Sequence, residues 1–144
     1  MTGDPEVMRH IGDGHVLDQG QAWREIATHL GHWGLRGYGQ WALERRDDGR
    51  LIGRAGLWNP AGWPGLEVGW MLARDAWGNG YATEAGAAAI EWAWRNLDVA
   101  SLISLIQPSN SASIRVAERL GMQRQRTLTL SGQEAVVFAL ERPT

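Results

Sequence analysis

The chain has 144 residues, a length typical of one domain with a sizeable hydrophobic core. Its formal net charge of −2 creates no global positive field, which argues against nucleic acid or an anionic membrane as partner. It has no cysteine, which excludes disulfides, thiolate nucleophiles and Cys-ligated zinc. No window is apolar enough to span a membrane, and the N-terminus lacks the apolar segment of a signal peptide. We therefore expect one cytoplasmic domain over residues 1–144, with no bound metal.

Two helices are predicted near the N-terminus. Asp4-Pro5 is typical of an N-cap followed by proline in the first helical turn, and Gly12 and Gly14 are expected to end this short helix. A second helix is predicted from about Asp18. Its apolar residues recur at spacings of three and four, as in an amphipathic helix: Trp23, Ile26, Ala27, Leu30 and Trp33. His29 and His32 lie three apart on this helix, and without a nearby third ligand we expect them at its surface.

A run of strands follows. Residues 38–58 alternate in polarity and predict a hairpin that turns at Asp48-Gly49. Residues 66–72 are apolar on both faces, which predicts a strand in a sheet covered on both sides. A helix is then expected to end near Asn96, before a short apolar strand over residues 101–107. This strand–helix–strand order gives parallel neighbours.

The C-terminal third predicts one more helix and a hairpin. The helix begins at a Ser/Asn cap and stops at Gly121, and the hairpin turns at Ser131-Gly132. The element order is thus α, α, β, β, β, α, β, α, β, β, which indicates a mixed α/β sheet.

The turn after strand 66–72 has the composition of an anion site. The segment 77–82 reads Trp-Gly-Asn-Gly-Tyr-Ala and leads directly into a helix. The first turn of a helix has unpaired N–H groups, and Gly78 and Gly80 would let the backbone approach a phosphate closely. The same glycines are equally compatible with turn geometry alone. The segment also lacks the third glycine of a dinucleotide fingerprint and the GK[ST] end of a P-loop.

Three segments together resemble the GNAT superfamily of acetyl-CoA-dependent N-acetyltransferases, with the RimJ/RimL-type branch as the nearest likeness. Residues 67–72 read Glu-Val-Gly-Trp-Met-Leu and are similar to the branch pattern E-[IV]-G-[YW]-x-L. Residues 77–85 match W-G-x-G-Y-A-x-E-A, and residues 110–113 match N-x-x-S. The likeness runs in the same order from Asp4 to the final hairpin.

The resemblance implies a GNAT-like fold: a central, mostly antiparallel sheet with a splayed parallel pair and helices on both faces. The family normally has a strand before the segment that begins at Asp4, so we expect either that the protein begins upstream of Met1 or that this N-terminal strand is missing. The neighbouring strand would then be open to pairing with a second subunit, which predicts a homodimer.

The resemblance also implies a cofactor site for acetyl-CoA, the acyl donor. The pantetheine arm would pair with the backbone of Met71 and Leu72, like an added strand. The pyrophosphate would bind backbone N–H groups of the turn, and Asn110 would lie beside the cofactor. The residues of the turn are Trp77, Gly78, Asn79, Gly80, Tyr81 and Ala82.

For catalysis the candidates are Glu67 and Ser113. Glu67 is an acid in an apolar strand, where desolvation should raise its pKa toward that of a general base. It is also compatible with a salt-bridged or solvated carboxylate at a strand end. Family members commonly use a tyrosine to protonate the leaving thiolate, but the matching position here is Ala117, which leaves Ser113. Asn110 and Ser113 are equally compatible with simple helix capping.

The implied function is therefore transfer of an acetyl group to a primary amine, either a protein N-terminal amine or a small molecule. The alternative is a non-catalytic acyl-CoA-binding module that keeps the turn without the chemistry, because the tyrosine is absent.

Overall fold

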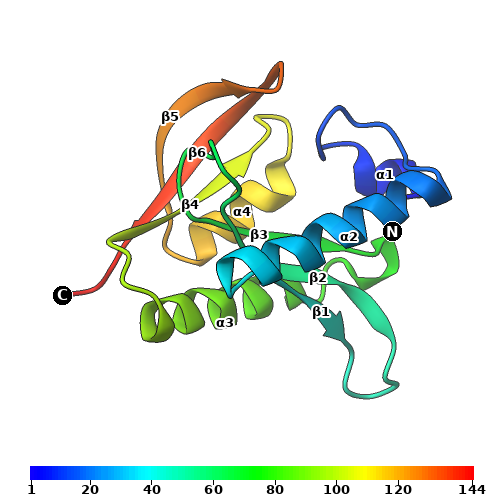
Figure 1. Ribbon diagram of the computed structural model, residues 1–144, viewed down its shortest axis with the longest axis horizontal. Coiled ribbons are helices and arrows are strands. Elements are labelled where there is room, and N and C mark those ends of the chain that lie inside the picture. Colours follow the sequence, from blue (N-terminus) through cyan, green and yellow to red (C-terminus); the bar gives the residue numbers. More distant parts are fainter.

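The computed structural model describes residues 1–144, and its centre is one six-stranded sheet in the order β1-β2-β3-β4-β6-β5 (Figure 1). Every neighbouring pair is antiparallel except β3 and β4, which run parallel. The predicted mixed sheet is thereby confirmed. The strands are β1 (Gln40–Glu44), β2 (Leu51–Trp58), β3 (Glu67–Leu72), β4 (Ser101–Ile106), β5 (Gln123–Leu130) and β6 (Gln133–Glu141).

The parallel pair is splayed, as expected. Every residue of β3 pairs with β2, but β3 and β4 share a single ladder position, between Glu67 and Ile103. Beyond that position the two strands diverge, so the edge of β3 that faces β4 has no strand partner toward Leu72, whose carbonyl oxygen accepts the Trp77 indole N–H at 3.1 Å. A split of this kind leaves backbone hydrogen-bonding groups available to a ligand.

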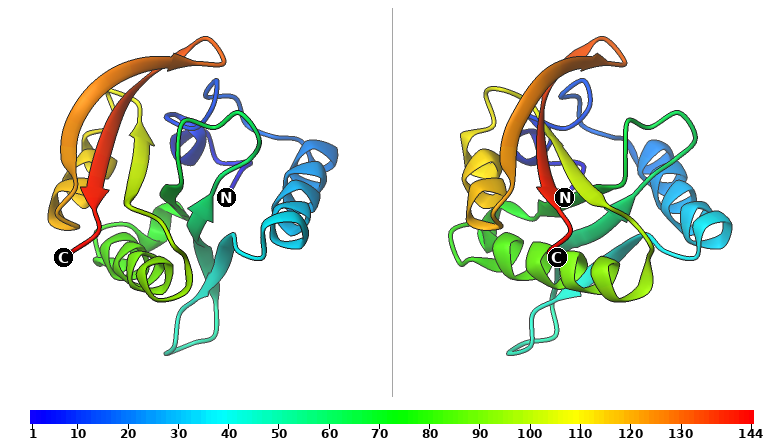
Figure 2. Two further views of the ribbon diagram at one scale, coloured as in Figure 1. Left: turned by 60° about the vertical axis from the view of Figure 1, so that its left-hand side comes forward. Right: turned by 90° about the vertical axis from the view of Figure 1, so that its left-hand side faces the viewer.

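Helices cover both faces of the sheet (Figure 2). α3 (Tyr81–Asn96) and α4 (Ser111–Arg119) share one hydrophobic core with the strands. α1 (Pro5–Met8) and α2 (Gln19–Arg36) lie on the opposite side, and a 3-10 turn, η1 (Arg74–Ala76), follows β3. The largest fully buried side chains are Phe138, Leu57, Leu102, Val68 and Val136.

Small residues bring α3 close to its neighbours. Gly86, Ala89 and Ala93 form its buried face together with Ile90. A Cβ atom at Gly86 would lie 2.8 Å from a methyl carbon of Leu120, so a larger residue here would require the Leu120 side chain to shift. The position of α3 fixes its N-terminus at the end of β3. The segment 77–82, called the glycine turn below, lies at this point.

α1 is a single turn that closes over the end of β3. Asp4 caps it by accepting the Glu6 N–H, as predicted, but the helix ends at Met8, before Gly12 and Gly14. The reason is packing, because Val7 and Met8 are buried against Met71 and the chain then turns back toward β4. The Asp4 carboxylate also pairs with Arg74 at 2.5 Å, which ties α1 to η1.

α2 has its polar face inward. A capping box at Asp18 begins the helix, as predicted, but Trp23, Ile26 and Leu30 are 70%, 60% and 67% exposed. His32 is only 6% exposed, and His29 is also turned inward, so the expectation of surface histidines is wrong. The periodicity identified the helix but could not show which stripe faces the sheet.

His32 connects α2 to the loop after β2. Its Nδ1 lies 2.9 Å from the carbonyl oxygen of Tyr38, and its Nε2 accepts the Asn59 N–H at 2.9 Å. This pattern requires the neutral ring with the proton on Nδ1. Its ring also stacks on Trp58, with the ring centroids 4.6 Å apart. Burial lowers the pKa of His32, which agrees with a neutral ring.

We predict that His32 makes the fold sensitive to acid. Since its pKa is lower in the folded than in the unfolded chain, the unfolded chain binds more protons between the folded pKa and about 6.5. The free energy of unfolding should therefore fall as the pH drops below about 6.5. His32→Phe should be less stable at neutral pH by about 1–3 kcal/mol, because two polar partners lose their bonds. The loss should shrink at lower pH, as measured by urea unfolding.

His15→Gln is the matched control, since His15 is exposed and far from this loop. An equal loss of stability for His32→Phe at every pH would contradict the assignment of a neutral, doubly bonded ring.

Candidate functional site

Two connected cavities lie where β3 and β4 separate. The first, which we call the α3–α4 groove, has a volume of about 620 Å³ and lies between α1 and the N-termini of α3 and α4. The second, the α2 pocket, has a volume of about 700 Å³ and is bounded by α2, the β2–β3 loop and the β5–β6 turn. Both cavities are lined by His10, Ile11, Trp70, Asn110 and Ser113.

The structure brings most of the predicted cofactor residues together in the α3–α4 groove. Those that line it are Met71, Leu72, Trp77, Gly78, Gly80, Tyr81, Ala82 and Asn110. Asn79 is the exception. Its side-chain amide donates to the carbonyl oxygens of Ala76 and Trp77 at 3.2 and 3.0 Å, so it braces the turn from inside.

The glycine turn presents a row of free amides to this groove. Gly78 and Gly80 have φ angles of 75° and 79°, in the left-handed region that favours glycine. The first helical hydrogen bond at this end runs from the Glu84 N–H to the Gly80 carbonyl. No N–H over residues 78–83 donates to another group of the chain, whereas the Trp77 N–H, expected to bind the pyrophosphate with them, instead donates to the Arg74 carbonyl oxygen at 3.1 Å. Free donors at the N-terminus of a long helix are the usual device for binding a phosphate.

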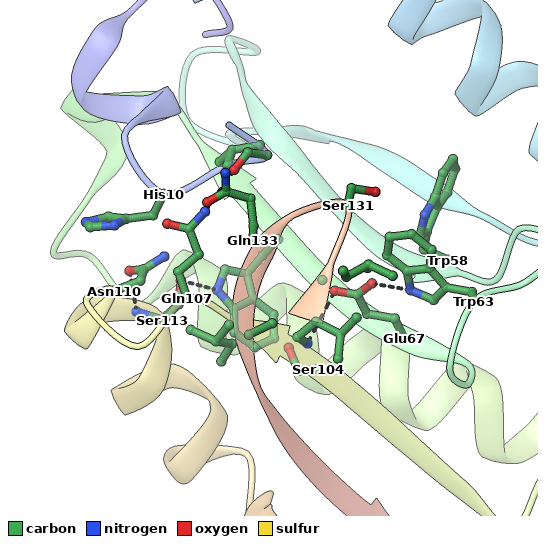
Figure 3. A pocket seen from close by; sticks show the side chains of 18 of the residues that line it. His10, Trp58, Trp63, Glu67, Ser104, Gln107, Asn110, Ser113, Ser131 and Gln133 are labelled. Carbon is green, nitrogen blue, oxygen red and sulfur yellow. Dashed lines mark hydrogen bonds between the residues drawn. The ribbon is translucent and has the colours of Figure 1, made fainter. Parts of the chain in front are cut away.

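Glu67 lies at the point where the two strands part. Its Oε2 accepts the Trp63 indole N–H at 2.7 Å, and its Oε1 accepts the Leu105 backbone N–H at 3.4 Å (Figure 3). The carboxylate therefore occupies the gap between β3 and β4, and it lines the α2 pocket.

Burial raises the pKa of Glu67 to about 7, although the bonds from Trp63 and Leu105 and the charge of Arg54 act in the opposite direction. A carboxyl group with this pKa exchanges a proton readily near neutral pH. The alternative of an ordinary solvated carboxylate does not fit this environment.

Asn110 and Ser113 lie on the other side of the pocket from Glu67 (Figure 3). Asn110 caps α4 by accepting the Ser113 N–H at 3.1 Å, so the predicted capping role is present. The Ser113 hydroxyl accepts the Trp70 indole N–H at 3.2 Å. Since that bond uses a lone pair, the hydroxyl proton stays available to a ligand in either cavity. Ala117, at the position of the family's tyrosine, is fully buried in the core.

The far wall of the α2 pocket is an ion pair between a helix and the sheet. Arg54 on β2 donates to Glu25 on α2 at 3.0 Å and to the Gln40 side chain. His29 lies 3.9 Å from the same carboxylate, and His29 together with Arg54 lowers the pKa of Glu25. The Nδ1 atom of His29 is buried without a hydrogen-bond partner. This wall is thus polar and charged, unlike the apolar core on the other face of the sheet.

Several contacts of the site were not predicted from the sequence, although Trp58 and Trp63 were candidates for an acceptor groove and both line the α2 pocket. Trp63 stands in a loop rich in Pro and Gly, and no local pattern ties it to Glu67, four residues further on. Arg54 and Glu25 are 29 residues apart, so only the fold brings them together. Trp70 could have been suspected, because it stands inside the segment 67–72 that carries the family likeness.

A split parallel pair beside a turn of free amides is an arrangement able to bind an extended, phosphate-bearing ligand. Comparison with known proteins agrees. The family model described as acetyltransferase (GNAT) domain matches residues 1–123. The chain therefore belongs to the GNAT acetyltransferase family.

Individual relatives support this. The chain is 33% identical to the uncharacterized protein YkkB of Bacillus subtilis, over 96% of this chain and 80% of that protein. It is 28% identical to an acetyltransferase of known structure from Agrobacterium tumefaciens, with a TM-score of 0.81 over 96% of this chain and 82% of the other. It also has the fold of AAC(6')-Ib, solved with ribostamycin and coenzyme A, with 19% identity and a TM-score of 0.80 over 98% of this chain and 84% of the other.

No helix combines the length and the apolar character that crossing a bilayer requires. No group of three or more His, Asp or Glu side chains is arranged to hold a metal ion.

We predict that Trp63 holds down the pKa of Glu67. Trp63→Phe removes a donor to the ionised carboxylate while keeping an aromatic ring, so the pKa of Glu67 should rise above its value of about 7. The carboxyl-carbon chemical shift of Glu67, followed by NMR against pH, measures this directly. Trp58→Phe is the control, because Trp58 lines the same pocket and makes no bond to Glu67. An unchanged midpoint in Trp63→Phe would show that this hydrogen bond does not control the carboxyl group.

Proposed function

We propose that the protein transfers the acetyl group of acetyl-CoA to a primary amine, by direct attack of the amine on the thioester. The observation that carries the proposal is the position of Glu67, whose carboxyl group has a pKa of about 7 and lines the α2 pocket, a cavity that shares five lining residues with the α3–α4 groove. One cavity has the features of a cofactor groove, and the other has room for a small acceptor or the end of a peptide.

The cofactor assignment rests on the α3–α4 groove. The free amides of residues 78–83 would bind the pyrophosphate, and the unpaired edge of β3 at Met71 and Leu72 would pair with the pantetheine arm. Asn110 would face the cofactor, and its amide NH₂ remains available after the side chain has capped α4. The coenzyme A complex of AAC(6')-Ib, which has the same fold, supports this choice of cofactor.

Glu67 would act as the general base. An amine at neutral pH is mostly protonated, so it must lose a proton before its nitrogen can attack the thioester carbonyl. The Glu67 carboxylate accepts that proton first. The C–N bond then forms and the C–S bond breaks, and the second proton that the nitrogen loses ends on the coenzyme A thiolate. The N–H donors of Trp63 and Leu105 hold this carboxylate where β3 and β4 separate, and they fix its orientation.

Ser113 would donate a proton to the departing thiolate of coenzyme A. Its hydroxyl accepts from Trp70, which leaves its proton free to point toward the junction of the cavities. A backbone N–H of β3 near Met71 would stabilise the oxyanion of the tetrahedral intermediate.

The acceptor is a primary amine in either of two settings. The likeness to the RimJ/RimL-type branch favours the N-terminal amine of a protein, and solved ribosomal-protein-alanine acetyltransferases share the fold. AAC(6')-Ib, solved with ribostamycin, favours a small amine. The carboxylates of the α2 pocket suit a cationic acceptor in both cases.

We predict that acetyl-CoA and CoA stabilise the protein and that ATP does not. A ligand at about one hundred times its dissociation constant adds roughly 2.7 kcal/mol. For a domain of this size the melting temperature should rise by about 5–10 °C. Differential scanning fluorimetry measures the shift. No shift with acetyl-CoA at about millimolar concentration would remove the cofactor assignment, and an equal shift with ATP would point to a generic nucleotide site.

We predict that Glu67→Gln abolishes most turnover but keeps the acetyl-CoA shift. Loss of a general base lowers turnover by about 10²–10⁴-fold. For the unmodified enzyme, kcat/KM should rise with pH through a midpoint near the Glu67 pKa of about 7, since only the carboxylate accepts a proton. Glu118→Gln, on the exposed face of α4, is the control. Full turnover in Glu67→Gln would exclude this base, and binding without turnover on any amine would favour the non-catalytic module.

A further inference from the structure

α2 turns a large apolar surface to solvent. Trp23, Ile26 and Leu30 are 70%, 60% and 67% exposed and lie on the same side of the helix. Single exposed apolar residues are common on proteins, but adjacent ones on one helix face mark an interaction surface. The opposite side of α2 carries Glu25, His29 and His32, so the helix faces the sheet with its polar side.

The same outward face carries glycines that the chain's own packing does not explain. A Cβ atom at Gly31 or at Gly34 would meet nothing within 4 Å. Glycine weakens a helix interior relative to alanine, so an unneeded glycine is unfavourable there. Both positions allow another backbone to approach closely, which nothing in this chain does.

We propose that α2 packs antiparallel against α2 of a second copy, across a two-fold axis. The contact seam, defined here as Trp23, Ala27, Leu30 and Gly34, has spacings of four, three and four. This is the spacing with which two helices pack side by side. An axis level with the midpoint between Ala27 and Leu30 places Trp23 against Gly34 of the partner subunit, and Leu30 against Ala27 of the partner subunit.

This pairing identifies the occupant as a second copy. Each large side chain of the seam meets a small one, and the same surface provides both halves, as a two-fold contact requires. No residue of the seam is charged. In this register Arg24 lies at the level of Trp33 of the partner subunit, so no like charges meet.

The surface is large enough for a reversible dimer. A contact that covers Trp23, Ile26, Leu30 and the neighbouring surface of α2 would bury roughly 600 Å² per copy, or about 1,200 Å² in total. That is the lower end of the range for specific interfaces, which is typical of a reversible rather than an obligate dimer. The contact would also hold α2 in place, with Glu25 and His29 in the wall of the α2 pocket.

The oligomeric state tests the proposal. Multi-angle light scattering at about 100 µM should show a dimer that dissociates on dilution. Leu30→Lys should give a folded monomer at that concentration, as checked by circular dichroism and by the acetyl-CoA shift. Leu35→Lys is the matched control, because Leu35 is 89% exposed on the same helix but outside the seam, and it should stay dimeric.

A monomer at this concentration without substitution would overturn the proposal. A dimer that persists in Leu30→Lys would also overturn it, and would favour pairing through the free edge of β1, the outer strand of the sheet.

Cross-linking tests the antiparallel register. The chain has no cysteine, so single cysteines can be placed without side reactions. A mixture of Ala27→Cys and Leu30→Cys proteins should form a disulfide-linked pair faster than either protein alone, because the two positions face each other across the axis. Leu35→Cys should cross-link slowly. Faster cross-linking of Ala27→Cys alone than of the mixture would overturn the antiparallel arrangement.

Discussion

The separation of β3 and β4 is the constraint on which the site depends. Parallel strands normally continue their ladder, yet these two share one position, at Glu67 and Ile103. The Glu67 carboxylate then takes the N–H of Leu105, a donor that the split leaves without a strand partner. A buried polar group needs such a bond, so the side chain and the split stabilise each other. The same geometry buries the carboxyl group and raises its pKa to about 7.

The two faces of the sheet carry different kinds of packing. On the side of α3 and α4 an apolar core fixes the glycine turn relative to β3, through close contacts such as that of Gly86 with Leu120. On the side of α2 the contacts are an ion pair, a doubly bonded histidine and stacked rings. Polar contacts of this kind are directional and add modest net stability. The α3–α4 groove is therefore built on the face with the apolar core, and the α2 pocket is bounded by α2, which is held by polar contacts.

The sequence predicted those parts of the fold that local patterns determine. The order of elements, the capped start of α2, both hairpin turns and the split parallel pair all follow from periodicity, turn residues or the family likeness. The inward histidines of α2 could not be predicted, since its apolar stripe is stronger than its polar one and would normally face the core. The bonds from Trp63 to Glu67 and from Trp70 to Ser113 depend on side-chain directions that only the assembled sheet determines.

The two faces of α2 differ in character, because the face toward the sheet is polar and the face toward solvent is apolar. Its inner face is polar, because Glu25 and His29 line the α2 pocket, so the helix gains little from burial against the sheet. Its glycines lower its intrinsic stability further. A helix of this kind needs another source of stability, and the exposed stripe of Trp23, Ile26 and Leu30 is the apolar surface that remains available. Burying that stripe against a second copy would stabilise the pocket wall without placing any apolar residue in the pocket itself.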